Sequence, residues 1–197
     1  MDKRSTRSVA RRRLFVGIAL DAPTRAALVN ASLAFERAGL RARFERAEKL
    51  HVTLAFLGSV GSERVAPLIA ALRAGVTAIA PFTVRFDALG AFPNDRRARM
   101  VWAGARKPDA AFALLARAVR DAAREFARLD EKQAVLHVTL GRLREPARLP
   151  PHRLAAQSML VDEIVLFESL PGEGTSRYEV VERFPLTVHA SSPAAST

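Results

Sequence analysis

Hydrophobic positions along the chain follow two different spacings. Continuous or alternating apolar stretches predict strands near 14–20, 50–57, 82–86, 98–105, 134–143, 158–169 and 178–188. Apolar residues at helical spacing predict helices over about 21–37, 62–76 and 108–129. A short strand is expected around Phe44, and the Gly- and Pro-containing residues 90–95 predict a turn. The chain is therefore expected to mix helices with runs of strands.

The order of these elements indicates the fold class. The first strand is not followed by the glycine-rich fingerprint of dinucleotide-binding folds. Neighbouring strands mixed with helices are typical of α+β folds with antiparallel sheet. We expect one α+β domain over residues 14–188, preceded by a basic disordered tail at 1–13 and followed by a mobile tail at 189–197.

One tetrapeptide, His-Val-Thr-Leu, occurs twice in predicted strands. It spans residues 51–54 and again residues 137–140, which is 137 − 51 = 86 positions later. Side chains alternate between the two faces of a strand, so each copy presents an imidazole and a hydroxyl on one face. A long helix lies next to each copy in sequence. The pattern indicates two pseudo-symmetric lobes, with antiparallel sheets flanking a central cleft and one motif in each lobe.

The paired motifs suit acid–base chemistry at phosphorus. Because imidazole titrates near pH 6.5, His51 and His137 could exchange protons with a substrate in opposite directions. The hydroxyls of Thr53 and Thr139 could hold anionic oxygens, and Arg142 supplies a cation that binds phosphate in bidentate fashion. Such a set can hydrolyse a phosphodiester without a metal ion.

The motifs have two other interpretations. A single His-Val-Thr-Leu is usually only a strand segment, but here two of the four histidines lie in identical tetrapeptides. A histidine pair can also bind zinc, yet neither motif has a carboxylate or a third histidine at ligand spacing. We therefore expect no metal and no cofactor.

Composition narrows the range of partners. Lys and Arg number 31 against 20 Asp and Glu, a net charge of +11, which favours RNA, DNA or phosphorylated metabolites as partners. An Arg- and Ala-rich composition alone would also give this charge. Cysteine is absent, which excludes disulfides, thiolate metal sites and a cysteine nucleophile and fits a cytoplasmic location. No apolar run approaches the roughly 20 residues of a membrane span, so no membrane association is expected.

The two motifs resemble the paired His-x-Thr-x signatures of the two-histidine (2H) phosphoesterases. Within that superfamily, the chain looks like the bacterial RNA 2′,3′-cyclic phosphodiesterases, historically called 2′-5′ RNA ligases. The likeness extends over residues 13–18, 48–58, 92–93, 101–102, 169–178 and 184–186. One position departs from the pattern, because Leu136 stands where that family commonly has proline before the second histidine.

The resemblance implies a reaction and a role for each site residue. The reaction would open the 2′,3′-cyclic phosphate at an RNA end to a 2′-phosphomonoester, and reversible 2′-5′ ligation would accompany it. By resemblance, His51 would be the proton donor to the leaving 3′ oxygen and His137 the proton acceptor that activates water. The phosphate would be held by Thr53, Thr139 and Arg142.

The resemblance and the alternation rule disagree about one residue. The resemblance places Phe56 beside the nucleoside of the substrate. Strict alternation instead places Phe56 on the face opposite His51, in the core, unless the strand contains a bulge.

Two other functions stay open at this point. One is a basic RNA-binding module without catalysis, and the other is a related 2H enzyme that acts on a small cyclic nucleotide. The expected partners are RNA with 2′,3′-cyclic phosphate ends or small cyclic nucleotides, and the protein is expected to be a monomer.

Overall fold

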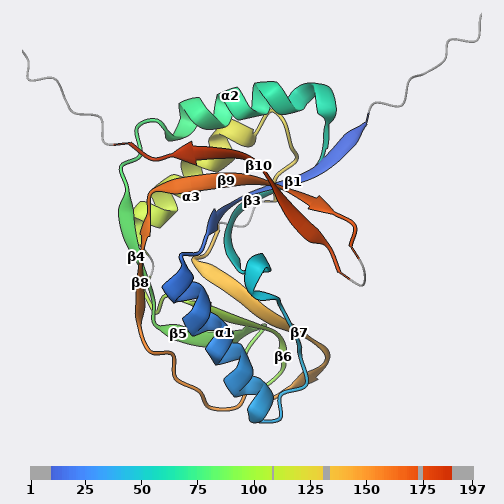
Figure 1. Cartoon of the computed structure of the whole chain (residues 1–197), viewed down its shortest axis with the longest axis vertical. Coiled ribbons are helices and arrows are strands. Elements are labelled where there is room, and N and C mark those ends of the chain that lie inside the picture. Colours follow the sequence, from blue (N-terminus) through green and yellow to red (C-terminus); the bar gives the residue numbers. More distant parts are fainter. Residues whose placement is uncertain (1–9, 108, 131–133, 173–174, 188–197) are drawn as a thin grey trace, which may run out of the picture.

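The structure is a computed structural model and describes residues 10–107, 109–130, 134–172 and 175–187 (Figure 1). The α+β class expected from the sequence is confirmed. The helices are α1 (Ala22–Arg37), α2 (Val65–Val76) and α3 (Ala110–Ala123). The strands are β1 (Arg11–Ala19), β2 (Arg43–Phe44), β3 (His51–Gly61), β4 (Phe82–Phe86), β5 (Ala88–Phe92), β6 (Ala98–Gly104), β7 (His137–Ala147), β8 (Gln157–Val161), β9 (Glu163–Leu170) and β10 (Arg177–Pro185).

Antiparallel pairing organises most of the strands into one sheet. Its order is β10-β9-β1-β3-β7-β6-β5, with β2 also paired to β7, while β4 and β8 form a separate two-stranded sheet. The two motif strands, β3 and β7, meet through a single residue pair, Val52 and Val138. This narrow junction divides the sheet into a β1 half (β10, β9, β1, β3) and a β7 half (β7, β6, β5, β2). The expectation of two separate lobes stays a prediction, because the Val52–Val138 pair still joins the two halves in one sheet.

Helices cover the two halves differently (Figure 1). Helices α2 and α3 pack on each other and against the β1 half, whereas α1 lies along the β7 half and β8. Each helix buries one apolar stripe; in α3 this stripe is Phe112, Leu115 and Val119. Full burial of such a side chain contributes about 1.5–3 kcal/mol. Helix α1 begins at Ala22, close to the predicted start, and Asp21 is its N-cap, whose carboxylate accepts a hydrogen bond from the Thr24 amide at 2.8 Å.

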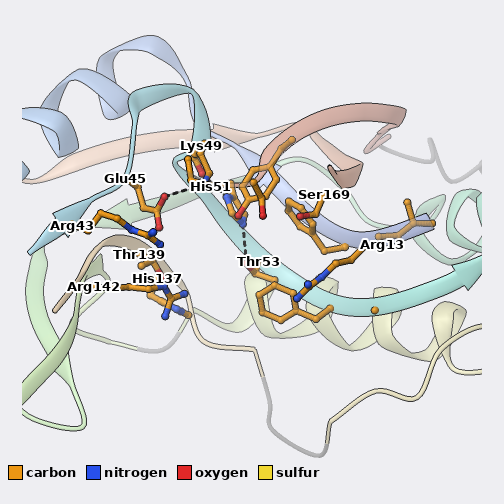
Figure 2. Close-up of a pocket in the computed structure, with 17 residues that line it drawn as sticks. Arg13, Arg43, Glu45, Lys49, His51, Thr53, His137, Thr139, Arg142 and Ser169 are labelled. Carbon is orange, nitrogen blue, oxygen red and sulfur yellow. Dashed lines mark hydrogen bonds and ion pairs between the residues drawn. The ribbon is translucent and has the colours of Figure 1, made fainter. Parts of the chain in front are cut away.

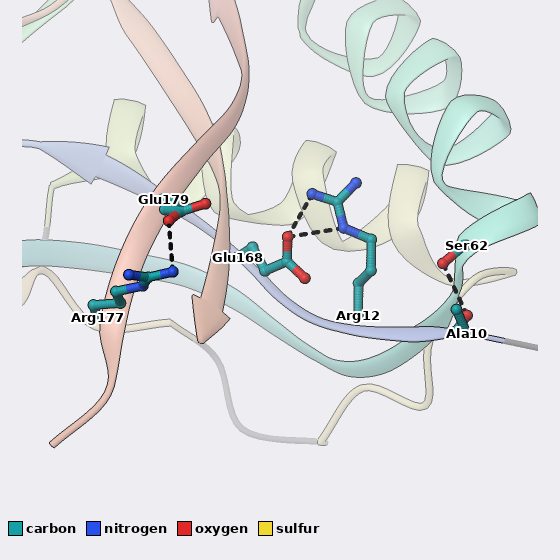
Figure 3. Close-up of polar contacts among 6 residues, drawn as sticks. All are labelled: Ala10, Arg12, Ser62, Glu168, Arg177 and Glu179. Atoms are coloured by element: carbon teal, nitrogen blue, oxygen red, sulfur yellow. Dashed lines mark hydrogen bonds and ion pairs between the residues drawn. The ribbon is translucent and has the colours of Figure 1, made fainter. Parts of the chain in front are cut away.

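The first strand begins earlier than the apolar run predicted. Residues 11–13, assigned above to a disordered tail, belong to β1. The Arg12 guanidinium bonds to Glu168 on β9 at 2.5 Å, and the Ser62 hydroxyl donates to the Ala10 carbonyl at 2.9 Å (Figure 3). Ordered partners of this kind hold a charged strand end in place. Ser62 opens the short 3-10 helix Ser62–Arg64, and α2 follows it at Val65 without a side-chain cap. Residues 1–9 and 188–197 lie outside the described residues, so the two tails stay predictions there.

Three other boundaries differ from the sequence-based expectation. The stretch 158–169 is two strands, β8 and β9, which pair in different sheets; alternation alone cannot reveal a change of partner. Part of the expected turn at 90–95 is β5, whose Ala and Gly residues have weak strand propensity. Helix α3 ends at Ala123 rather than near 129, and the Phe126 amide then bonds to the carbonyl of Ala123, three residues back, in a turn.

Candidate active site

A cavity of about 620 Å³ opens where the two motif strands meet (Figure 2). Both strands point their histidine and threonine into it, because the valine and leucine of each motif are buried on the opposite face. The cavity is lined by all six residues singled out from the sequence: His51, Thr53, Phe56, His137, Thr139 and Arg142. Positions far apart in the chain are therefore brought together around one space.

Each of the two imidazoles is oriented by a hydrogen bond to a backbone carbonyl two residues earlier. Nδ1 of His51 donates to the Lys49 carbonyl at 2.7 Å, and Nδ1 of His137 donates to the Val135 carbonyl at 2.9 Å. A carbonyl only accepts, so Nδ1 carries the hydrogen in both rings and Nε2 is the atom that can exchange a proton with a ligand. The Thr53 hydroxyl lies 3.1 Å from Nε2 of His51 and donates to it when the ring is neutral (Figure 2).

Burial lowers the pKa of His51 below its ordinary value of 6.5. The bond to the Lys49 carbonyl and the nearby Glu45 carboxylate act in the opposite direction, while His137 and the Lys49 ammonium lower this pKa further. His51 is consequently neutral at pH 7 in the free protein. An anion in the cavity would favour the protonated ring, because a negative charge within a few ångströms raises the pKa of an imidazole.

Two glycines allow the neighbouring strands to approach the motif strands closely. A Cβ on Gly17 of β1 would lie 2.7 Å from the Val52 carbonyl oxygen and 3.4 Å from Cδ2 of His51. A Cβ on Gly104, the pairing partner of His137 on β6, would lie 2.5 Å from the Leu136 carbonyl oxygen. Sequence reasoning missed this role. The available signal was a glycine inside a strand pattern, which marks close approach of another backbone.

Aromatic rings enclose both histidines. Phe15 lies 4.9 Å from His51 between ring centroids, and Tyr178 meets His51 edge-on at 5.4 Å. On the other strand, Phe92 meets His137 edge-on at 5.6 Å. Burial and the Glu45 charge raise the pKa of Tyr178, so its hydroxyl stays protonated at neutral pH. Aromatic packing therefore fixes ring positions that the motifs alone leave free.

Cations dominate the charge of the cavity. The Lys49 ammonium is already engaged, lying 3.3 Å from the Glu45 carboxylate and 2.8 Å from the Thr175 hydroxyl. Three arginines also line the cavity, Arg13, Arg43 and Arg142, and none has an ion-pair partner among the described residues. The cavity therefore has an excess of positive charge, which attracts an anion.

Comparison with known proteins places this geometry in a family. A family model described as LigT like Phosphoesterase matches residues 18–102. The RNA 2′,3′-cyclic phosphodiesterase of Escherichia coli (strain K12) is 35% identical over 143 residues, covering 72% of this chain and 78% of that protein. The chain belongs to the LigT-like phosphoesterase family.

Two further comparisons define the extent of the likeness. The RNA 2′,3′-cyclic phosphodiesterase of Geobacillus stearothermophilus is 34% identical over 146 residues, covering 71% of this chain but 46% of that protein, so the chain spans about half its length. The crystal structure of E. coli LigT complexed with 3′-AMP superposes with a TM-score of 0.79 at 28% identity. It covers 90% of this chain and 99% of that one.

The alternation rule is wrong for Phe56 in this LigT-like phosphoesterase. Gly17 pairs with Thr53 and Val16 with Ala55, so Leu54 is an extra residue in a bulge. Leu54 and Ala55 are then both buried, and Phe56 emerges on the His51 face with 67% of its surface exposed. The prediction of a core position is thereby corrected.

The same bulge occurs in the second motif strand. Trp102 pairs with Thr139 and Val101 with Gly141, which leaves Leu140 as the extra residue and brings Arg142 to the cavity face. Phe56 and Arg142 occupy equivalent positions, since 142 − 56 = 86 is the offset of the motifs. The LigT-like cavity is thus nearly symmetric in its acid–base groups but has an aromatic ring on one side and a guanidinium on the other.

The described residues contain neither a cluster of metal ligands nor a membrane-spanning helix. Within residues 10–107, 109–130, 134–172 and 175–187, no group of three or more His, Asp or Glu side chains is arranged to hold a metal ion. Over the same residues, no helix is long and apolar enough to cross a membrane.

Proposed function

We propose that this protein hydrolyses the terminal 2′,3′-cyclic phosphate of RNA to a 2′-phosphomonoester by metal-independent acid–base catalysis. The observation that carries the proposal is the pair of imidazoles, His51 and His137, on one cation-lined cavity, each with Nδ1 tied to a backbone carbonyl and Nε2 available. The names of the relatives from E. coli and G. stearothermophilus support this substrate class. The complex of E. coli LigT with 3′-AMP supports a nucleotide in the cleft.

The proposed step uses the two rings in opposite directions. Nε2 of His137 removes a proton from water as the water oxygen attacks phosphorus, and Nε2–H of His51 protonates the 3′ oxygen as its bond to phosphorus breaks. The products are a 2′-phosphate and a 3′-hydroxyl. A 5′-hydroxyl in place of water would give a 2′-5′ linkage by the same proton transfers, which is the reversible ligation inferred from the resemblance.

The assignment of His51 as the acid comes from the resemblance, and it requires the ring to gain a proton that its lowered pKa disfavours in the free protein. This ring is neutral in the free protein, so it must take up a proton when substrate binds. The charge of the phosphate and the Glu45 carboxylate both favour that protonation. With Nε2 protonated, the Thr53 hydroxyl no longer donates to the ring and is free to donate to a phosphoryl oxygen.

The remaining groups would hold the phosphate and the nucleoside. Thr139 donates only a weak hydrogen bond, to the sulfur of Met100 at 3.4 Å, which a phosphoryl oxygen can replace. Arg142 would clamp two phosphoryl oxygens. The exposed ring of Phe56, 6.2 Å from Phe15, offers a stacking surface for the base.

The test is turnover of an RNA oligonucleotide that ends in a 2′,3′-cyclic phosphate, with analysis of the product. We expect a 2′-phosphate product in the presence of a chelator, and a loss of about 10²–10⁴-fold in kcat for His51→Ala and for His137→Ala. His152→Ala is the control, because that ring packs on Phe35 outside the cavity. Full activity in either cavity mutant would contradict the mechanism. Salt-sensitive RNA binding without any turnover would favour the non-catalytic module instead.

A further inference from the structure

Five arginines extend from the cavity along β2 and β7 and the segments next to them. A second groove, of about 850 Å³, is lined by Arg41, Arg43, Arg144 and Arg148, and Glu145 is the one carboxylate among its described lining residues. Arg43 lines both this groove and the catalytic cavity. Arg142 of the cavity and the four arginines of the groove are called the arginine track below.

Pairing and alternation make the track continuous. After the bulge in β7, Arg142 and Arg144 are exposed while Leu143 between them is buried, so both arginines lie on the cavity face. On β2, Arg43 is the direct pairing partner of Arg142. The reacting position and the second groove are therefore connected by one row of guanidinium groups.

Within the described residues, the track arginines outnumber the carboxylates that line the cavity and the groove, Glu45 and Glu145. Like charges directly opposite on neighbouring strands, such as Arg43 and Arg142, destabilise a sheet. No track arginine forms an ion pair among the described residues, whereas the exposed Arg117 and Arg124 of the α3 region both pair with Asp121. A row of several guanidinium groups suits a polymer that carries several negative charges.

We propose that the arginine track binds the phosphodiester backbone of single-stranded RNA next to the reacting phosphate. This inference rests on the proposed function and extends it from the terminal nucleotide to an oligonucleotide. A cyclic mononucleotide carries one phosphate, which the cavity between His51 and His137 accommodates, and leaves the second groove empty. The backbone could come from the upstream part of the cyclic-phosphate strand or from a second strand that brings a 5′-hydroxyl. Both carry the same charge.

The experiment compares Arg144→Ala/Arg148→Ala with the control Arg117→Ala/Arg124→Ala. Each double variant lowers the net charge equally, from +11 to +9. The first readout is kcat/KM for a tetraribonucleotide ending in a 2′,3′-cyclic phosphate and for 2′,3′-cyclic AMP. The second readout is the dissociation constant of a 5′-hydroxyl tetraribonucleotide without a terminal phosphate, measured at several salt concentrations.

The track variant is expected to lose about tenfold in kcat/KM on the tetranucleotide, with less than a twofold change on cyclic AMP. If the backbone comes from the second strand, the loss appears instead as weaker binding of the 5′-hydroxyl oligonucleotide. In either case the salt slope of RNA binding should fall by about 1.4, since each phosphate contact on single strands contributes about 0.7.

Equal behaviour of the two double variants on every readout would overturn the proposal. An equal loss on cyclic AMP and on the tetranucleotide would also overturn it, because the arginines would then support the cavity rather than the backbone. If the wild-type protein turned over neither substrate, the proposed function would fail. The binding readout would still decide whether the track holds RNA.

Discussion

Replacing Gly17 by alanine tests whether close strand approach positions His51. The added Cβ would lie 2.7 Å from the Val52 carbonyl oxygen, whereas carbon–oxygen contacts between neighbouring strands are about 3.3 Å. The overlap is 3.3 − 2.7, or about 0.6 Å. The obstacle is backbone, so a side-chain rotation cannot relieve it. Strands β1 and β3 must separate at the level of His51 and Thr53.

The size of the effect follows from this overlap. Overpacking of a closely packed site costs about 1–3 kcal/mol of the free energy of unfolding. That leaves a domain of ordinary stability, about 5–15 kcal/mol, folded at 25 °C. A misplacement near 1 Å costs up to about 10²-fold in rate, so a shift of this order should lower kcat/KM by about 10–100-fold.

The assay is kcat/KM on 2′,3′-cyclic AMP beside urea unfolding. Gly39→Ala is a suitable control, because no atom lies within 4 Å of its added Cβ but its φ of 84° is unfavourable for alanine. That strain costs about 1–2 kcal/mol at a residue that does not line the cavity. Gly17→Ala should therefore lose much more activity than Gly39→Ala at similar stability. Equal activity of the two variants would refute the role of Gly17 in positioning the ring.

Three further predictions concern the cavity. Arg142→Lys should lower kcat/KM about 10-fold or more, because an ammonium cannot make the bidentate contact; wild-type kinetics would exclude that contact. Phe56→Ala should raise KM with little change in kcat, corresponding to about 1–3 kcal/mol of base stacking; an unchanged KM would exclude stacking. Stability should also depend on His51. Because folding lowers the pKa of His51, the unfolded chain binds more protons below about pH 6.5. The free energy of unfolding should rise with pH up to that value and fall as pH drops through the folded pKa. His51→Gln should flatten this rise in urea titrations at a series of pH values.

Much of the site could be predicted from local sequence because its chemistry lies in short strands. The repeated His-Val-Thr-Leu specifies which side chains share a face, since alternation is a property of the strand itself. The α+β class followed in the same way from element order. The α1 N-cap at Asp21 was also local, because the capping bond spans three residues.

Other features depended on contacts between distant segments. Alternation placed Phe56 in the core, and only the bulge beside β1 returned it to the cavity. The pKa of His51 depends on burial and on Glu45, neither of which is visible in the tetrapeptide. The basic stretch at 11–13 read as a tail, because its partner Glu168 lies 156 positions away from Arg12.

The sequence by itself determined the reacting groups of this protein: two imidazoles, two hydroxyls and a guanidinium, each at a fixed place on a strand. Tertiary structure decided the distances between these groups, their charge states and the position of the arginine track next to the cavity. The physical reason is that strand alternation is encoded within a few residues. Register, desolvation and summed charge arise only when β1, β3, β7 and β2 lie side by side.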